Sequence, residues 1–194
     1  MNSPKLLLVT LITLLLFTAC SDKEKLVYVE GDYPTKECRE EIKKGRDVSK
    51  EKEIDSIIVS KGKREMYLYK GDEKLYTFRV SLGKHPKGDK IKQGDYRTPI
   101  GSYSITRKSC NPKYYRMIYI SYPNAADRKA ARKRGVAVGS GITIHAQPFW
   151  NKNGKGDEYT LAHDWTNGCI ALSNSSMDIL WYSLKKGTPI IIKK

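Results

Sequence analysis

Three residues near the C-terminal half of the sequence, Cys169, His145 and His163, could take part in covalent catalysis. Cys169 directly follows Gly168 in the stretch HDWTNGCIALSN, which begins at His163, and His145 ends the apolar run GITIH. A cysteine is a strong nucleophile only as its thiolate, and a nearby histidine can take up the thiol proton. The glycine lets another part of the backbone approach the sulfur closely. These residues predict nucleophilic attack by Cys169, with His145 as the base.

A reaction of this kind also needs hydrogen-bond donors for the oxygen that gains negative charge, and backbone N–H groups around Thr166–Cys169 could provide them. Two other interpretations stay open on spacing alone. Cys169 could be an inert residue of a buried strand. Alternatively, His145, His163 and Cys169 could bind zinc, although their spacing matches no common ligand pattern and no fourth ligand is evident.

Short runs of β-branched and aromatic residues dominate the sequence from residue 54 onwards, and they predict the elements that position these side chains. The predicted strands are 54–61, 64–70, 74–83, 102–106, 114–123, 141–146, 169–172 and 188–194. Turn-prone residues separate the first three strands, which predicts two consecutive hairpins. The predicted helices are 124–135, between the N-cap Asn124 and the stop signal Gly135, and 173–187. We expect a mainly β fold, an antiparallel sheet or sandwich with a few flanking helices.

The first twenty residues have the pattern of an export signal. Lys5 is their only charged residue, and the apolar run Leu6–Phe17 that follows is shorter than the roughly 20 residues of a membrane-spanning helix. The run closes with FTAC and Ser21, which resembles the lipobox of a bacterial lipoprotein. That resemblance implies cleavage before Cys20 and lipidation of its sulfur. An ordinary secretory signal is the alternative.

The chain therefore divides into a signal peptide (1–20), a charged tether (21–53) with one short helix over 36–47, and a compact domain (54–194). Lysine and arginine number 36 against 21 acidic residues, a net charge of +15. This surplus favours polyanions such as nucleic acid, an anionic membrane or an acidic wall polymer, or it is simply a solvated surface. Export and the lack of a nucleic-acid motif argue against nucleic acid as a partner. We expect a monomer in the cell envelope, facing the periplasm and anchored in a membrane through Cys20, and Ser21 is typical of retention in the outer membrane.

Three cysteines remain besides Cys20, namely Cys38, Cys110 and Cys169. An exported protein can form disulfides, and three thiols allow one pair and one leftover. The spacing alone does not identify which cysteine stays free.

The motifs GDYRTPIGSYSI, ITIHA and DWTNGCIALSN, in that order, resemble the L,D-transpeptidase catalytic domain of the YkuD type. The stretches VSLG (80–83), RTPIG (97–101) and SYPNAAD (121–127) further resemble its YafK-like branch. The resemblance covers about residues 54–194. It implies a mainly β, sandwich-like fold with a few flanking helices.

The resemblance also implies a reaction. Cys169 would be the nucleophile and His145 its general base, and the turn shaping the oxyanion pocket would contain Thr166, Asn167 and Gly168. The implied substrates are the peptide stems of peptidoglycan. The thiolate would attack the L,D-amide before the terminal D-alanine, and an amine would resolve the thioester, either cross-linking stems or attaching a protein. The family needs no metal or cofactor.

The sequence departs from the family pattern in ways that affect substrate recognition. Asn167 stands where many members have histidine, and Ala171 where many have an arginine that could hold a stem carboxylate. That role could pass to an arginine elsewhere: Arg97, Arg107 or Arg116. His163 could orient substrate or be an ordinary surface residue. The stretch NKNGKGDEY (151–159) has the character of an insertion, which we expect to form a loop over the site.

Two alternatives to acyl transfer remain, and both would suit an exported basic protein. The chain could hydrolyse the same L,D-linkages, or it could bind the cell wall without catalysis. If Cys169 is the catalytic residue, Cys38 and Cys110 are free to pair.

Overall fold

Runs of β-branched and aromatic residues form the strands of the sheet, as the sequence predicts, and burial alternates along them. In β1 (Ser56–Ser60) the side chains of Ile57 and Val59 are buried, and in β8 (Pro189–Lys193) those of Ile190 and Ile192 are buried while Ile191 is exposed. The computed structural model describes residues 33–44 and 53–194. The strands are β1 (Ser56–Ser60), β2 (Glu65–Lys70), β3 (Glu73–Arg79), β4 (Gly101–Asn111), β5 (Tyr115–Ile120), β6 (Thr143–His145), β7 (Ile170–Ala171) and β8 (Pro189–Lys193).

These strands form one eight-stranded mixed sheet in the order β3-β2-β1-β8-β4-β5-β6-β7. The pairs β1–β8 and β6–β7 are parallel, and the other neighbours are antiparallel. The two predicted hairpins, β1–β2 and β2–β3, are present. The mainly β class with flanking helices is confirmed, although two strand pairings are parallel where the sequence suggested an antiparallel sheet.

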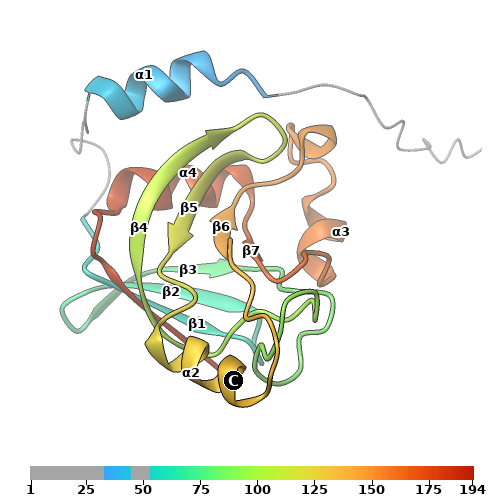
Figure 1. Cartoon of the computed structure of the whole chain (residues 1–194). Coiled ribbons are helices and arrows are strands. Elements are labelled where there is room, and N and C mark those ends of the chain that lie inside the picture. Colours follow the sequence, from blue (N-terminus) through green and yellow to red (C-terminus); the bar gives the residue numbers. More distant parts are fainter. Residues whose placement is uncertain (1–32, 45–52) are drawn as a thin grey trace, which may run out of the picture.

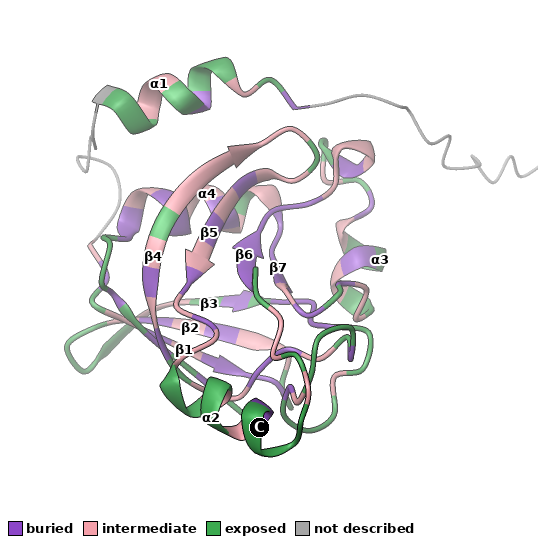
Figure 2. Cartoon of the chain, in the orientation of Figure 1, coloured by how far each residue is buried: buried purple, intermediate pink, exposed green. Residues whose placement is uncertain are grey.

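The long strand β4 makes the sheet fold back on itself. Its first residues, Gly101–Ser104, pair with β8, and the residues from Ile105 onwards pair with β5. The register shifts between Ile105 and Arg107, an irregularity of the kind that bends a strand. As a result β1–β3 lie beneath β5–β7 in the view of Figure 1, and both halves contain buried segments (Figure 2). Buried residues of both halves belong to one hydrophobic cluster.

Residues that follow β3 close this arrangement on the side of β7. Ser81 pairs with Ala171 in an antiparallel bridge, and Gly83 pairs with Thr166 in a parallel one. The chain after one end strand of the sheet therefore borders the opposite end strand. This contact brings a loop from the first half of the domain to the cysteine-bearing turn.

The helices lie around this sheet: α1 (Lys36–Lys44), α2 (Ala125–Lys133), α3 (Asp157–Ala162), α4 (Asn174–Ser183) and the short 3-10 helix η1 (Phe149–Asn151). Helix α2 begins at the predicted cap, where the Asn124 side chain accepts from the Asp127 amide and the Asp127 carboxylate accepts from the Asn124 amide. Gly135 follows its end with a φ of +66°. Helix α4 has Ser173 as its N-cap.

The stretch 151–159, expected to be a loop, instead contains the end of η1 and the start of α3. The buried side chain of Asn151 organises it by accepting from the Gly156 amide and donating to the Asp157 carboxylate and to Gln147. Gly154 and Gly156 are poor helix formers, so the local sequence pattern did not predict this short helix.

Residues 33–44 of the predicted tether lie against the β4–β5 hairpin, with α1 running across it (Figure 1). Cys38 in α1 forms a disulfide with Cys110 near the end of β4. The predicted helix over 36–47 is therefore present over 36–44. The pairing left open by the sequence is made, and Cys169 is the free cysteine of the described residues.

The predictions for residues 1–20, including the signal peptide and Cys20, lie outside the described residues. Within residues 33–44 and 53–194, no helix combines the length and apolar character that crossing a membrane requires.

Candidate active site

Strand β6 presents two polar side chains on one face. Thr143 and His145 are two residues apart, so they point the same way, while Ile144 between them is buried in the core. β6 lies between β5 and β7, pairing His145 with Met117 on one side and with Ala171 on the other. Both neighbouring strands hold the backbone of His145, which fixes the position from which its ring projects.

The imidazole of His145 is held in a defined orientation. Its Nδ1 lies 2.8 Å from the carbonyl oxygen of Ala146, and a carbonyl can only accept, so Nδ1 carries the proton and Nε2 keeps its lone pair. The rings of Tyr114 and Trp165 pack against it, with centroids 4.6 Å and 5.5 Å away. The ring is 3% exposed. A histidine so constrained is suited to accept a proton at Nε2.

The turn before Cys169 depends on glycine and on an internal hydroxyl. Gly168 has a φ of +126°, and a Cβ there would lie 2.8 Å from the carbonyl oxygen of Arg97. The buried Thr166 hydroxyl accepts from the Gly168 amide at 3.1 Å and donates to the Cys169 carbonyl at 2.7 Å. The Gly168 amide, one of the predicted oxyanion donors, is thus already engaged.

A second segment supports this turn from outside. The Thr98 hydroxyl accepts from the Gly83 amide at 2.9 Å and lies 3.5 Å from the carbonyl oxygen of Cys169. Gly83 is packed so closely that a Cβ would lie 3.0 Å from the Cα of Gly168 and 2.2 Å from the carbonyl oxygen of Tyr96. Thr98 of the Thr-Pro-Ile-Gly motif therefore packs against the turn that carries Cys169 and links it to Gly83.

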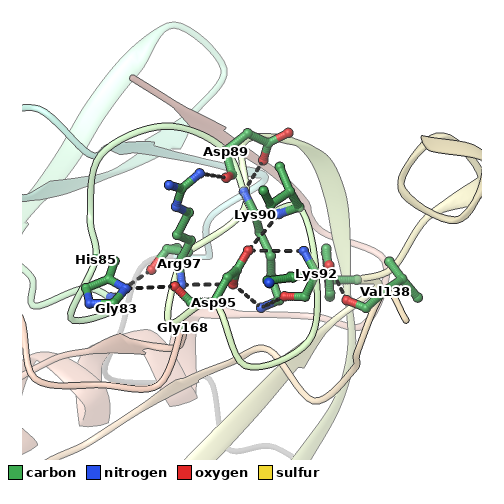
Figure 3. Close-up of polar contacts among 12 residues, drawn as sticks. Gly83, His85, Asp89, Lys90, Lys92, Asp95, Arg97, Val138 and Gly168 are labelled. Atoms are coloured by element: carbon green, nitrogen blue, oxygen red, sulfur yellow. Dashed lines mark hydrogen bonds and ion pairs between the residues drawn. The ribbon is translucent and has the colours of Figure 1, made fainter. Parts of the chain in front are cut away.

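The loop that carries Thr98 is built around the carboxylate of Asp95 (Figure 3). Asp95 accepts from the Lys90 ammonium at 2.7 Å and from the backbone amides of Ile91, Lys92 and Arg97. Lys90 and Asp95 are both buried. Burial alone would raise the pKa of Asp95, but these hydrogen bonds lower it below the ordinary value. One carboxylate therefore holds four residues of this loop together.

Cys169 lies where these elements meet. Its Sγ is 3.4 Å from the Thr143 hydroxyl, which donates to it, and 3.7 Å from the carbonyl oxygen of Gly141. Burial raises the pKa of the thiol. The hydrogen bond with His145, the positive charge that His145 carries when protonated and the Thr143 contact lower it by more, so the net pKa is below the ordinary value. The thiol of Cys169 therefore ionises more readily than an ordinary cysteine.

The predicted substrate arginines are placed differently from one another. Arg97 is half-buried at the edge of the site, with its carbonyl against Gly168 and its guanidinium donating to the carbonyl oxygen of Asp89. Arg116 is 3% exposed and pairs with Asp178, Glu41 and the Tyr182 hydroxyl. The two terminal nitrogens of Arg116 are taken up by this buried network, while its Nε has no hydrogen-bond partner among the described residues. This burial argues against the expected role of Arg116 in substrate binding. Arg107 stacks on the Tyr119 ring at 3.4 Å.

The remaining predicted residues lie at the surface. Asn167 is exposed within the cysteine turn, and His163 is exposed, with Nδ1 2.8 Å from the Tyr159 carbonyl oxygen and its ring against that of Tyr159. His163 makes contacts within α3 and its end, not with Cys169. Over residues 33–44 and 53–194 no group of three or more His, Cys, Asp or Glu side chains could hold a metal ion.

Sequence reasoning missed Thr143, Tyr114 and Trp165. The first carries a detectable signal, because residues two apart in a strand share a face and Thr143 precedes His145 by two. Tyr114 lies in a distant segment and Trp165 in the DWTNGC motif itself, and nothing in their local sequence indicates that they enclose the imidazole.

The domain is mainly β, and it places a thiol of lowered pKa beside an oriented histidine. These two features together are typical of cysteine-dependent enzymes. Comparison with known families gives the particular class, since residues 54–192 match the family model described as "L,D-transpeptidase catalytic domain", YkuD. The chain belongs to this family, which confirms the resemblance noted in its motifs.

Individual relatives agree with this assignment. The chain is 28% identical over 118 residues to YafK of Escherichia coli K12, whose name assigns it provisionally to the L,D-transpeptidases, and this match covers 59% of the chain and 39% of YafK. Pgp2 of Campylobacter jejuni, titled a helical cell shape determining protein, aligns with a TM-score of 0.55 at 25% identity over 74% of this chain and 48% of Pgp2. Bd1075 of Bdellovibrio bacteriovorus aligns with a TM-score of 0.50 at 26% identity, over 71% and 47%. The chain thus spans half or less of each relative.

Proposed function

We propose that this chain is a cysteine acyltransferase that acts on the peptide stems of peptidoglycan. The observation that carries the proposal is the arrangement of Cys169 beside His145, whose Nδ1 is committed to the Ala146 carbonyl and whose Nε2 is left to accept a proton. Membership of the L,D-transpeptidase catalytic domain family supports the choice of substrate. The involvement of Pgp2 in cell shape supports a role in wall architecture.

In the first half-reaction the thiol proton passes to Nε2 of His145, and Sγ of Cys169 attacks the carbonyl carbon of the L,D-amide before the terminal D-alanine. The carbonyl oxygen becomes an oxyanion. We assign its donor to the Cys169 backbone N–H, because the Gly168 N–H is already bound to Thr166. The C–N bond then breaks, and the imidazolium gives its proton to the amine of the departing D-alanine. The rest of the stem stays bound to Cys169 as a thioester.

In the second half-reaction an amine attacks the thioester carbon. His145 removes a proton from the incoming amine, the C–S bond breaks, and the thiolate of Cys169 is regenerated. An amine from a second stem gives a cross-link, and an amine of a protein gives protein attachment. Water in place of the amine gives hydrolysis, the alternative reaction for the same site.

A wall-binding lipoprotein without catalysis is the other alternative. It would need neither a lowered thiol pKa nor an oriented histidine, and both are present here. The acyltransferase proposal accounts for these features, and the binding proposal leaves them without a use.

The place of action in this proposal is the cell envelope. Cleavage before Cys20 and lipidation of its sulfur would anchor the chain to a membrane facing the periplasm, and Ser21 favours the outer membrane. A basic surface would favour residence beside wall polymers that carry carboxylates. Arg97, at the edge of the site, is the arginine we propose for a stem carboxylate.

Mass spectrometry tests the reaction directly. Residues 21–194 are incubated with purified disaccharide-tetrapeptide, beside the Cys169→Ala variant. We expect loss of D-alanine and a protein adduct that are absent in the variant, with a dimeric product for cross-linking or a bare tripeptide for hydrolysis. Release of D-alanine by both proteins would exclude Cys169 as the nucleophile, and release by neither would favour the binding alternative.

A further inference from the structure

Tyr33 fills the junction between two segments that hold the imidazole of His145. Its backbone amide donates to the Pro112 carbonyl at 2.6 Å, at the tip of the β4–β5 hairpin. Its hydroxyl donates to the Pro148 carbonyl at 3.3 Å, in the loop after β6. Its ring packs between those of Tyr115 and Phe149, each with a centroid distance of 5.3 Å. Tyr33 is 7% exposed, so its side chain is buried in this junction.

The hairpin tip matters because it carries Tyr114. The Tyr114 ring lies over the His145 ring, with 4.6 Å between centroids. The tip is also tied to the loop after β6, since the Phe149 amide donates to the Lys113 carbonyl at 3.0 Å. A displacement of the tip would therefore move a ring that sets the orientation of the imidazole.

The loop after β6 matters because its first residue accepts the Nδ1 proton of His145. The next residue, Gln147, is fully buried, and its backbone N–H donates to the side-chain oxygen of Asn174 at 3.1 Å. The same Asn174 side chain donates to the Tyr33 hydroxyl at 3.1 Å. Tyr33 is thus two hydrogen bonds from Gln147, which directly follows the Ala146 carbonyl.

Helix α1 holds Tyr33 in this junction. The Cys38–Cys110 disulfide bonds the helix covalently to β4, across 72 residues of sequence. Near the other end of the helix, Glu41 accepts from Arg116 at 2.8 Å and from the Tyr182 hydroxyl at 3.0 Å. Arg116 belongs to β5, the strand that starts at the hairpin tip. Residues 33–44, which we call the clasp, are therefore fastened at several points to the hairpin beside the site.

We propose that the clasp is part of the active-site scaffold, that Tyr33 is a positioning residue for His145, and that the Cys38–Cys110 disulfide secures it. The inference rests on the proposed function, because it concerns the same Cys169–His145 pair. It also extends the catalytic unit beyond residues 54–192, which match the family. An intact disulfide keeps the imidazole oriented, and loss of the clasp leaves the histidine able to turn.

The test measures the thiol itself, so it does not depend on knowing the substrate. The full chain in mild detergent is alkylated with iodoacetamide over a range of pH, and mass spectrometry follows the peptide that contains Cys169. The variants are Cys38→Ser with Cys110→Ser, which leaves no extra thiol at the clasp, Tyr33→Phe and Tyr33→Ala. Tyr67→Phe in β2 is the matched control, because it also removes a hydroxyl that is bonded, to Glu65, but far from the clasp.

If the clasp positions His145, the alkylation midpoint shifts to higher pH in the clasp variants and stays unchanged in Tyr67→Phe. If the thiol pKa rises by about one unit, the thiolate fraction at a pH below the midpoint falls about tenfold. The more basic thiolate is about threefold more nucleophilic, so we expect the alkylation rate at that pH to fall about threefold. With stem peptide as substrate, kcat should fall while KM changes little, because the clasp supports the two segments that orient the base.

His145→Asn separates failure of this inference from failure of the proposed function. If the midpoint moves in His145→Asn but stays at the wild-type value in all clasp variants, the clasp does not position the histidine and the inference is overturned. If His145→Asn itself has a wild-type midpoint, the proposed function fails. Far-UV circular dichroism checks folding. Should Tyr33→Ala unfold, Tyr33→Phe and the double serine variant still decide the question.

Discussion

Substituting Gly168 by alanine tests whether the turn before Cys169 can exist only with glycine. The backbone there has a φ of +126°, in a region that residues with a Cβ rarely adopt, and holding such a residue in it costs about 1–3 kcal/mol. The added Cβ would also lie 2.8 Å from the Arg97 carbonyl oxygen and 3.2 Å from Cδ1 of Ile142. The first of these atoms is backbone of the loop braced by Asp95, so it cannot move without disturbing that loop.

Overpacking of this kind costs about 1–3 kcal/mol in addition to the backbone term. The two costs together come to about 2–6 kcal/mol, so we expect Gly168→Ala to lose about 4 kcal/mol of folding free energy, which lowers Tm by about 8–16 °C for a chain of this size. Gly71→Ala is the control, since Gly71 has a φ of +55° but nothing within 4 Å of an added Cβ. Gly71→Ala should show the smaller cost of a left-handed backbone conformation without any close contact.

Thermal unfolding by circular dichroism gives the stability of both variants, and iodoacetamide alkylation reports on Cys169. In Gly168→Ala we expect slower alkylation, because the displaced turn moves Sγ away from Thr143 and His145. A Gly168→Ala protein as stable as Gly71→Ala, with wild-type alkylation, would show that the turn has room to relax. The close approach of backbone to Gly168 would then have no energetic importance.

The other predictions concern the polar side chains of the site and its supporting loop. Asparagine cannot take up a proton, so in His145→Asn the rate of D-alanine release should fall about 10²–10⁴-fold. The alkylation midpoint should also rise, because His145 lowers the pKa of the thiol. An unchanged release rate would rule His145 out as the base. Thr143→Val removes the hydroxyl 3.4 Å from Sγ, and its alkylation midpoint should rise by less than that of His145→Asn; an equal or larger rise would give Thr143 the dominant role. Asp95→Asn leaves the buried Lys90 unpaired and should cost about 3–5 kcal/mol at neutral pH by denaturant unfolding. Because the folded pKa of Asp95 is lowered, its contribution is present above the unfolded value of about 3.9 and is lost as pH falls through the folded pKa, so wild type and variant should converge in acid; a pH-independent difference would contradict this.

Local sequence predicted those parts of the fold that depend on neighbouring residues. Runs of β-branched and aromatic residues located the strands, and the Asn124 cap with the Gly135 stop located α2, because each of these signals acts over a few residues. The pairing of His145 with Cys169 was expected from their residue types and the motifs around them. The parallel pairing of β6 with β7 that brings them together was not expected, because the sequence suggested an antiparallel sheet.

Long-range pairings could not be predicted in this way. Arg116 looked like a substrate ligand because its partners, Glu41 and Asp178, are 75 and 62 residues away in sequence. Nothing near Arg116 distinguishes a buried ion-pair residue from one that faces a ligand. The docking of residues 33–44 was hidden for the same reason, since a charged stretch with one cysteine gives no local sign of what it will pack against.

The short strand β7 restricts how a peptide can reach the cysteine. Ala171 is bonded on one side to β6 and on the other to Ser81, which accepts its amide proton at 2.8 Å and donates to its carbonyl at 3.0 Å. Many peptide-binding domains capture an extended ligand by adding it to an open sheet edge. No such edge is open beside Ala171, so main-chain pairing there cannot select the ligand. A peptide ligand of Cys169 would therefore have to be recognised by contacts other than strand addition at Ala171.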